Sequence, residues 1–158
     1  MSKFLRAFAL TLAVLVFQPS MAGEAVPINA TFGIAWTLVD WDDPADRITE
    51  SLGAAQLPGG RTVGIATRDH LNTVTGRISS DYLALVLTDT DWVYAQYTDI
   101  PAGFDPATNT AGFGGPLEVV GGEGRFAGAS GTLTIHSKIL FSLPVGTFAI
   151  KGVIRTAD

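Results

Sequence analysis

The amino-acid sequence predicts an all-β protein whose eight antiparallel strands form an up-and-down β-barrel. Apolar residues recur along most of the chain with a period of two, which is typical of strands with one buried face. Short turn signals separate these segments, so consecutive strands are expected to be antiparallel neighbours, because a parallel crossover needs about a dozen residues or more. No convincing amphipathic helix is found. A sheet of this size folds over itself as a sandwich or closes into a barrel, and sequential hairpins favour the barrel.

Each strand is predicted from apolar residues that share one face. The eight predicted strands are 30–39, 61–69, 72–79, 82–88, 91–99, 116–121, 131–141 and 147–156. The one-sided apolar sets, in chain order, are Phe32, Ile34, Trp36 and Leu38; Val63 and Ile65; Val74 and Ile78; Leu83, Leu85 and Leu87; Leu133, Ile135, Ile139 and Phe141; and Phe148, Ile150 and Ile154. In 91–99, Val93, Ala95 and Tyr97 share one face and Trp92, Tyr94 and Gln96 the other.

Turns and irregular stretches connect these strands. The short turn signals are His70-Leu71-Asn72, Ser79-Ser80-Asp81, Asp89-Thr90 and Pro144-Val145-Gly146. Two longer stretches, 40–60 and 101–116, are expected to be irregular because they are rich in turn-forming or small residues. Within the first of them, 46–56 is expected to form a turn or two of helix or a further short strand.

The first 22 residues are predicted to be a secretory signal peptide. Lys3 and Arg6 precede the apolar run 8–17, and Ser20-Met21-Ala22 offers small residues at the two positions that a signal peptidase reads. Ten residues at about 1.5 Å per residue cover about half of a ~30 Å hydrocarbon core, which disfavours a membrane anchor. We expect cleavage after Ala22 and a single β-barrel domain, 23–158, that is secreted or periplasmic and does not bind a membrane.

The composition excludes several classes of function. The chain of 158 residues has no cysteine, which excludes disulfides, thiolate metal sites and a nucleophilic cysteine. Its 10 basic residues face 15 acidic ones, and removal of residues 1–22 takes away two basic residues, leaving 8 against 15 and a formal charge of −7. This acidic balance argues against a nucleic-acid partner.

No metal or cofactor is expected. The histidines lie apart, His70 in a predicted turn and His136 on a polar face, whereas a transition-metal site needs about three or four convergent ligands. The acidic cluster Asp40, Asp42, Asp43 and Asp46 lacks the spacing of a calcium-binding EF-hand.

A glycine-rich motif runs from Val119 to Gly131, with the sequence VVGGEGRFAGASG. Its glycines permit positive φ, so one strand can end here, make a compact turn and return to the sheet. The expected turn residues are Gly121, Gly122, Gly124, Phe126 and Gly131. The motif also fits the nucleotide fingerprint G-x-G-x-x-A, but a strand follows it instead of a helix, which disfavours nucleotide binding.

This motif and the strands that follow it resemble the allene oxide cyclase and dirigent protein superfamily. The similarity covers residues 117–156, including the Gly-Thr-Leu-Thr strand and the terminal Gly-Thr-Phe-Ala-Ile-Lys-Gly strand. The resemblance implies a calycin-like barrel with an apolar lumen, and a homo-oligomer, trimer or dimer. The matched residues shape a turn and are not the catalytic residues of that superfamily.

Asp69 is the candidate catalytic residue. If Val63 and Ile65 point inward, alternation carries Thr67 and Asp69 to the same side, where an apolar surrounding would raise the pKa of the Asp69 carboxyl. The alternative, which the sequence favours, is that Asp69 lies beyond the core and is solvated beside His70.

Aromatic residues are the candidate ligand-binding groups. The candidates are Trp36, Tyr82, Trp92 and Tyr94. Aromatic rings with one polar atom suit a barrel mouth that binds a flat apolar ligand. The same residues also suit core packing or a subunit interface, and no single period places all of them inside.

Three functional hypotheses follow from the sequence. The first is an exported barrel that binds a small hydrophobic molecule in its lumen. The alternatives are a cyclase or isomerase of the allene oxide cyclase or dirigent type, and a structural or adhesion barrel without ligand. A cavity would favour the first two over the third, and an ionisable group facing that cavity would favour an enzyme over a simple binder.

Overall fold

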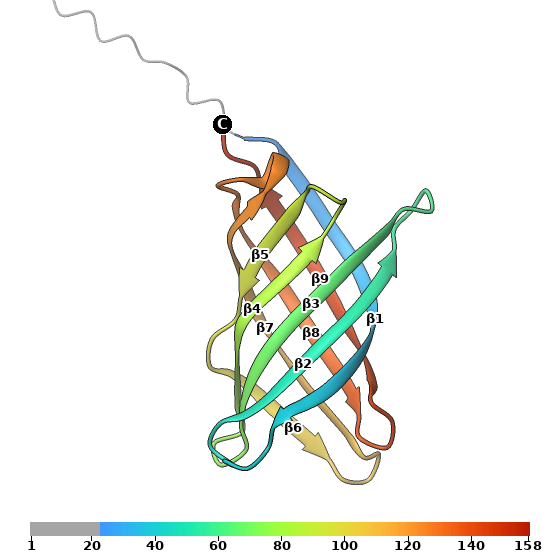
Figure 1. Ribbon diagram of the computed structural model, residues 1–158, viewed down its shortest axis with the longest axis vertical. Helices are drawn as coiled ribbons and strands as arrows, with labels where there is room; N and C mark the ends of the chain where they lie inside the picture. Colours follow the sequence, from blue (N-terminus) through green and yellow to red (C-terminus); the bar gives the residue numbers. More distant parts are fainter. Residues whose placement is uncertain (1–22) are drawn as a thin grey trace, which may run out of the picture.

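The computed structural model describes residues 23–158, so the predicted signal peptide lies outside the described residues. Its nine strands are β1 (Ala25–Asp40), β2 (Arg47–Gln56), β3 (Thr62–Asn72), β4 (Arg77–Val86), β5 (Trp92–Gln96), β6 (Ile100–Asp105), β7 (Thr110–Glu123), β8 (Ser130–Leu140) and β9 (Val145–Arg155) (Figure 1). A short 3₁₀ helix, η1 (Gly124–Phe126), follows β7. Within the described residues, no helix is long and apolar enough to cross a membrane.

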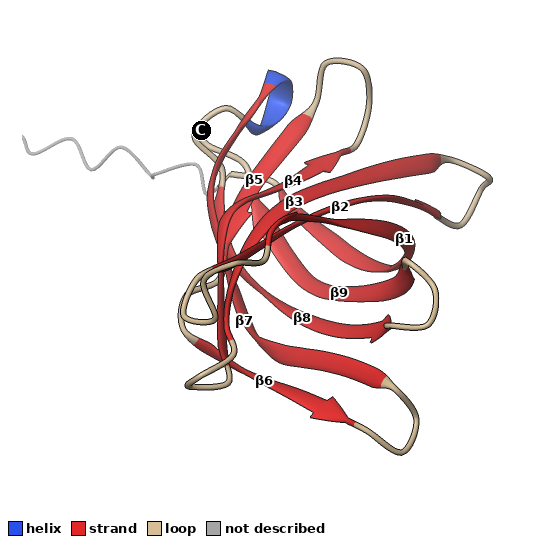
Figure 2. Cartoon of the chain, turned by 60° about the horizontal axis from the view of Figure 1, so that its bottom comes forward, coloured by secondary structure: helices blue, strands red, loops and turns tan. Residues whose placement is uncertain are grey.

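The strands close into a barrel with eight strand positions. All pairings are antiparallel, β1 pairs with both β2 and β9, and the β3–β4 pairing completes the ring. β5 and β6 share one position, because each of them pairs with β4 on one side and with β7 on the other. The wall is seen from its lower end in Figure 2. The predicted all-β, eight-stranded antiparallel up-and-down barrel is confirmed.

The break between β5 and β6 is held by serine side chains from β4. The Ser80 hydroxyl accepts the Tyr97 N–H at 3.0 Å, and the Ser79 hydroxyl accepts the Asp99 N–H at 2.8 Å. Asp99 has a φ of 52°, and its carboxylate pairs with Arg77 at 2.9 Å. The turn predicted at Ser79-Ser80-Asp81 is therefore wrong. These residues lie inside β4, where they satisfy backbone donors that the interrupted neighbour leaves free.

Two further boundaries differ from the prediction. β3 continues through the predicted turn His70-Leu71-Asn72 and ends at a turn at 73–76. The single strand β4, which begins after that turn, takes the place of the two predicted strands 72–79 and 82–88. The Asn72 carboxamide oxygen accepts the N–H groups of Val74 and Thr75 and so forms that turn.

Both stretches expected to be irregular contain strands. β2 lies within 40–60, where a short strand at 46–56 was one of the two alternatives, and most of β6 with the first part of β7 lies within 101–116. The inward-facing residues of β2 are Arg47, Thr49, Ser51, Gly53 and Ala55, so the strand has no run of alternating large apolar residues to reveal it. The eight predicted strands match the eight strand positions of the barrel, not its nine strands, because β4 was predicted as two strands while β2 and β6 were not among the eight.

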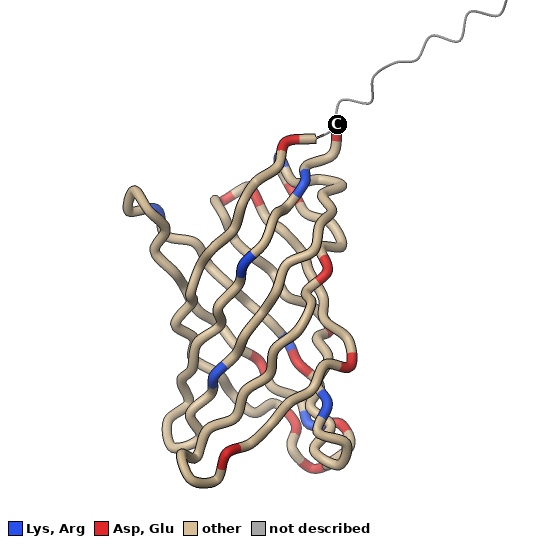
Figure 3. The backbone as a smooth tube through the Cα atoms, turned by 180° about the vertical axis from the view of Figure 1, so that it is seen from behind, with Lys and Arg blue, Asp and Glu red and all other residues tan. Residues whose placement is uncertain are grey.

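The upper part of the barrel, at the end that carries η1 in Figure 1, is filled with apolar side chains. Buried residues of this part are Ile28, Leu85, Leu87, Val93, Val119, Phe126, Leu133 and Ile154. Charged residues are sparse along the wall seen in Figure 3, and many of the acidic ones lie near the two ends. The barrel is therefore held together mainly by burial of its interior face.

The glycine-rich motif forms the connection between β7 and β8. Gly124 begins η1 with a φ of 61°, and a Cβ at this position would meet the Thr90 carbonyl oxygen and the Asp91 carboxylate. Gly131 has a φ of 148°, and a Cβ there would approach the Val153 carbonyl oxygen across the sheet. These backbone conformations and close approaches require glycine.

Gly124→Val is expected to lower the free energy of unfolding by more than about 1 kcal/mol, because valine is strained at positive φ and collides with the backbone of Thr90. Chemical denaturation measures the change. The control is Gly33→Val at an exposed strand position, where a Cβ meets nothing within 4 Å and the change should stay within about 0.5 kcal/mol. Unchanged stability of Gly124→Val would contradict this role of the turn.

Candidate functional site

The lower part of the barrel holds an apolar cavity with one acidic residue in its wall. Its volume is about 70 Å³, and it adjoins an outer chamber of about 540 Å³ that opens at the lower end. The inner cavity is lined by Trp36, Trp41, Thr49, Ser51, Asp69, Leu71, Ile78, Ala102, Ala111, Gly112, Phe113, Ile139, Phe141 and Phe148. Trp41, Leu71, Ala102, Ala111 and Phe141 line both chambers, so the two form one continuous space. Among residues 23–158, Asp69 is the only charged one that lines the inner cavity.

Asp69 reaches this cavity because the alternation of β3 places it inside. Val63, Ile65 and Thr67 are buried on the same face of the strand, and Asp69 is only 2% exposed. Burial disfavours the ionised form and raises the pKa of Asp69 from 3.8 to about 6, although hydrogen bonds from Thr67 and Tyr97 act in the opposite direction. The expectation that Asp69 is solvated beside His70 is wrong, because β3 does not end before this residue.

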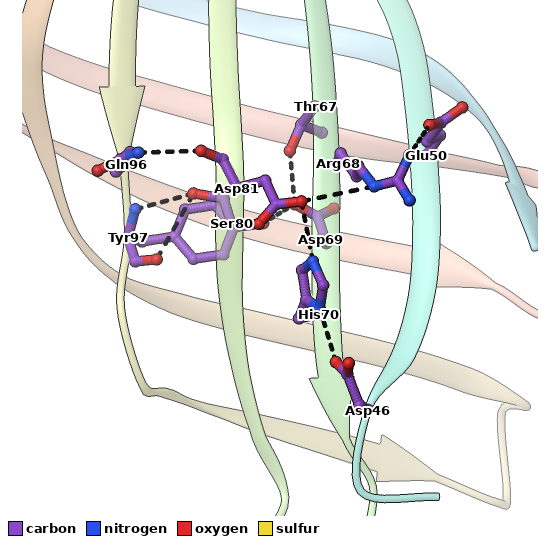
Figure 4. A network of polar contacts seen from close by, with 10 residues as sticks. All are labelled: Asp46, Glu50, Thr67, Arg68, Asp69, His70, Ser80, Asp81, Gln96 and Tyr97. Atoms are coloured by element: carbon purple, nitrogen blue, oxygen red, sulfur yellow. Dashed lines mark hydrogen bonds and ion pairs between the residues drawn. The ribbon is translucent and has the colours of Figure 1, made fainter. Parts of the chain in front are cut away.

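Two hydroxyl groups hold one oxygen of the Asp69 carboxylate (Figure 4). The hydroxyls of Thr67 and Tyr97 each donate to Oδ1 at 2.5 Å. Among residues 23–158, no hydrogen bond to Oδ2 is found. The carboxylate is therefore fixed by one oxygen, while the other remains an acceptor for a molecule in the cavity.

Tyr97 completes this arrangement from the break between β5 and β6. Its side chain is buried, and burial together with the neighbouring Asp69 carboxylate raises the pKa of the Tyr97 hydroxyl well above its ordinary value. The phenol therefore stays protonated and donates its hydrogen to Asp69. Its ring packs on Phe113 at 5.1 Å between centroids, and Phe113 packs in turn on Phe148 at 5.8 Å.

Aromatic rings form the wall toward the open end. Trp36 and Phe104 each pack edge-on against Phe141, with 5.5 Å between ring centroids in both pairs. The indole N–H of Trp36 is buried and has no hydrogen-bond partner among the described residues. The wall thus combines flat apolar surfaces with an unused donor.

The other aromatic candidates do not reach the cavity. Trp36 lines it, but Trp92 and Tyr94 lie on the outer face of β5, opposite the buried Val93 and Ala95. The Tyr94 hydroxyl donates to Glu123 at 2.5 Å outside the barrel. Tyr82 also faces outward and is 43% exposed. Successive side chains of a strand point to opposite faces of the sheet, so these three residues of β4 and β5 point away from the interior and the prediction that they bind a ligand in the lumen is not supported.

Sequence reasoning did not name several aromatic residues of the site as candidates, among them Tyr97 and Trp41. Tyr97 shares a face with Val93 and Ala95, so its inward position was visible in the period of the strand, but it was not chosen as a candidate. Trp41 follows β1 in the acidic loop, where no period applies. Its place in the cavity wall could not be read from the sequence.

A separate polar network lies on the outer face of β3, on the opposite side of the strand from Asp69 (Figure 4). His70 contacts Asp46 at 2.6 Å and Asp81 at 2.9 Å, and its hydrogen bonds to the carboxylates of Asp81 and Asp46 raise the pKa of the imidazole. Arg68 pairs with Glu50 at 2.9 Å. Within the described part of the chain, no group of three or more histidine or acidic residues has an arrangement that could hold a metal ion.

Asp69→Asn is expected to stabilise the protein above about pH 6 and to have little effect near pH 4. The folded-state pKa is raised, so in the wild type the unfolded chain loses the Asp69 proton first, and stability declines as pH rises from 3.8 to about 6. Asparagine removes this decline, which amounts to at most about 3 kcal/mol. Denaturation at several pH values measures the difference.

The matched control is Asp89→Asn, in an exposed turn. Its stability should follow that of the wild type across the same pH range. An Asp69→Asn effect that does not change with pH would contradict the desolvated carboxylate.

Comparison with known proteins shows a likeness of fold. No family model matches the chain, and no curated protein matches it at a significant level. Among solved structures, pyocyanin demethylase matches with a TM-score of 0.53 and 14% sequence identity, over 80% of this chain and 99% of that chain. The resemblance of the glycine-rich motif to the allene oxide cyclase and dirigent superfamily stays a prediction. The chain thus has an antiparallel β-barrel fold similar to that of pyocyanin demethylase.

Proposed function

We propose that this protein binds a small, flat and mainly apolar molecule in the lower cavity, with a hydrogen-bond donor of that molecule on Asp69 Oδ2. The observation that carries the proposal is a buried carboxylate in an apolar cavity, with one oxygen held by Thr67 and Tyr97 and the other free of partners among the described residues. A ligand that supplies a donor to this oxygen gains a charge-assisted hydrogen bond inside an apolar cavity, where such a bond is stronger than in water.

The shape and chemistry of the wall support a flat ligand. The rings of Trp36, Phe113 and Phe141 face a common space, and aromatic rings prefer to pack against other flat rings. Small residues at Ala102 and Ala111 leave room between the inner cavity and the outer chamber. Apolar walls also exclude water, which strengthens a hydrogen bond to Asp69.

The fold likeness adds support for small-molecule chemistry. Pyocyanin demethylase acts, by its name, on pyocyanin, and it has a similar fold. This likeness transfers no residue role to the present chain. It favours a lumen ligand over a purely structural or adhesive barrel, as does the cavity itself.

Proton transfer is the second candidate function, and the raised pKa of Asp69 favours it. With a pKa of about 6, the carboxyl group is close to the ideal for a general acid or base near neutral pH. In an isomerase or cyclase, Asp69 would take a proton from one atom of the substrate and return it to another, with no net change in protonation. Turnover that is lost in Asp69→Asn, with the fold intact, would favour this candidate over binding alone.

Naphthalene and 2-naphthol test the proposed binding site, because they differ only in a hydroxyl donor. We expect the wild type to bind 2-naphthol more tightly, and Asp69→Asn to weaken 2-naphthol binding by about tenfold while leaving naphthalene unchanged. The fluorescence of Trp36 and Trp41, both in the cavity wall, reports the binding.

Two controls accompany this measurement. Asp89→Asn changes an exposed carboxylate outside the cavity and should bind both probes like the wild type. Ala102→Phe places a ring where the two chambers meet and should weaken the binding of both probes. Absence of binding by the wild type, or equal affinities for the two probes, would refute the proposal.

A further inference from the structure

Of the described residues that line the outer chamber, one is charged, Arg47, and its charge is opposite to that of Asp69. Arg47 is half-buried at the start of β2, and its guanidinium lies 4.3 Å from the centre of the Trp41 ring. Its Nε is buried and has no hydrogen-bond partner among the described residues. Within residues 23–158, no carboxylate lies within ion-pair distance of it.

An arginine in this position has donors that the protein does not use. A guanidinium presents five N–H donors in one plane, and half-buried arginines normally meet carboxylates or carbonyl groups. The neighbouring Asp46 does not serve, because it contacts His70 on the outside of the barrel at 2.6 Å. Stacking on Trp41 covers one face of the guanidinium but leaves the donors in its plane available to the chamber.

The register of β2 and β3 fixes the spacing between Arg47 and Asp69. Thr49 pairs with Asp69 and Arg47 pairs with Leu71, so Arg47 lies two residues nearer the open end than the level of Asp69. Two residues of a strand span about 7 Å. A continuous space therefore has an acidic residue in its inner part and a basic residue whose backbone lies about 7 Å farther along the wall toward the open end.

We propose that Arg47 binds a carboxylate at the outer end of the ligand whose donor reaches Asp69. This inference rests on the proposed function and narrows it to one class of ligand: flat aromatic acids with an O–H or N–H group at the opposite end of the ring system. The planar donors of Arg47 match the two oxygens of a carboxylate. An aromatic body spans the apolar neck between the two polar ends.

Because the protein as a whole is acidic, a preference for an anionic ligand depends on a local positive group such as Arg47. Once residues 1–22 are excluded, the chain has eight basic and fifteen acidic residues, so its general field repels anions. At physiological ionic strength this field is screened beyond about 8 Å. A preference for an anionic ligand therefore has to arise from direct contact in the chamber, which is where Arg47 lies.

Three fluorescent probes separate the two ends of the site. The first is 6-hydroxy-2-naphthoate, with a hydroxyl and a carboxylate at opposite ends; the second is its methyl ester, which keeps the hydroxyl; and the third is 2-naphthoate, which keeps the carboxylate. At physiological salt we expect the wild type to bind the hydroxy acid at least about tenfold more tightly than either of the others.

Arg47→Gln is expected to remove the preference for the acid over the ester while leaving affinity for the ester unchanged. Arg47→Lys keeps the charge but not the paired donors, so it should keep part of the preference. Arg61→Gln, an exposed position that lines neither chamber, is the matched control and should behave like the wild type. Circular dichroism verifies the fold of each variant.

The possible failures are distinguishable. If the ester and 2-naphthol bind but the acid binds no more tightly than the ester, or Arg47→Gln keeps the full preference, the role of Arg47 is overturned and the proposed function stands. If neither 2-naphthol nor the ester binds to the wild type, the proposed function fails and this inference fails with it. The acid-to-ester ratio of the wild type alone decides the matter if both Arg47 variants fail to fold.

Discussion

The site depends on one constraint: along each strand of the closed sheet, successive side chains point alternately into the barrel and out of it. Once Val63 and Ile65 face the interior, the pleat of β3 carries Thr67 and Asp69 to the same side, whatever the cost of desolvating a carboxylate. Hydroxyl donors from Thr67 and Tyr97 offset part of that cost and leave the pKa of Asp69 at about 6. The break between β5 and β6 matters because it delivers Tyr97 to this position.

Side-chain size explains why the barrel is filled at one end and hollow at the other. In the upper part, large residues such as Leu85, Phe126 and Ile154 meet in the interior. In the lower part, the small side chains of Ser51 and Ala102 line the cavity and leave space in the interior. The cavity is thus a consequence of which residues each strand presents at its lower end.

The same choice of residues limits what can be predicted from the sequence. Strands such as β1 and β9 were predicted from their apolar alternation, because they present large side chains to the filled part. β2 was only one of two alternatives for 46–56, because Thr49 and Ser51, which help to keep the lower part open, remove the hydrophobic signal of a strand. The inward position of Asp69 followed from period two, but its burial depended on β3 extending past His70, where the local sequence resembles a turn. Contacts between distant strands, such as Tyr97 with Asp69, have no local signature at all.

The most direct test of this account is the titration of the Asp69 side-chain carboxyl carbon by NMR. The account predicts a midpoint of about 6, well above the ordinary value of 3.8, and a lower midpoint when 2-naphthol is bound, because a hydrogen-bond donor favours the carboxylate. A midpoint near 3.8 that does not respond to 2-naphthol would mean that Asp69 is solvated, and would contradict the desolvated site at the end of the cavity.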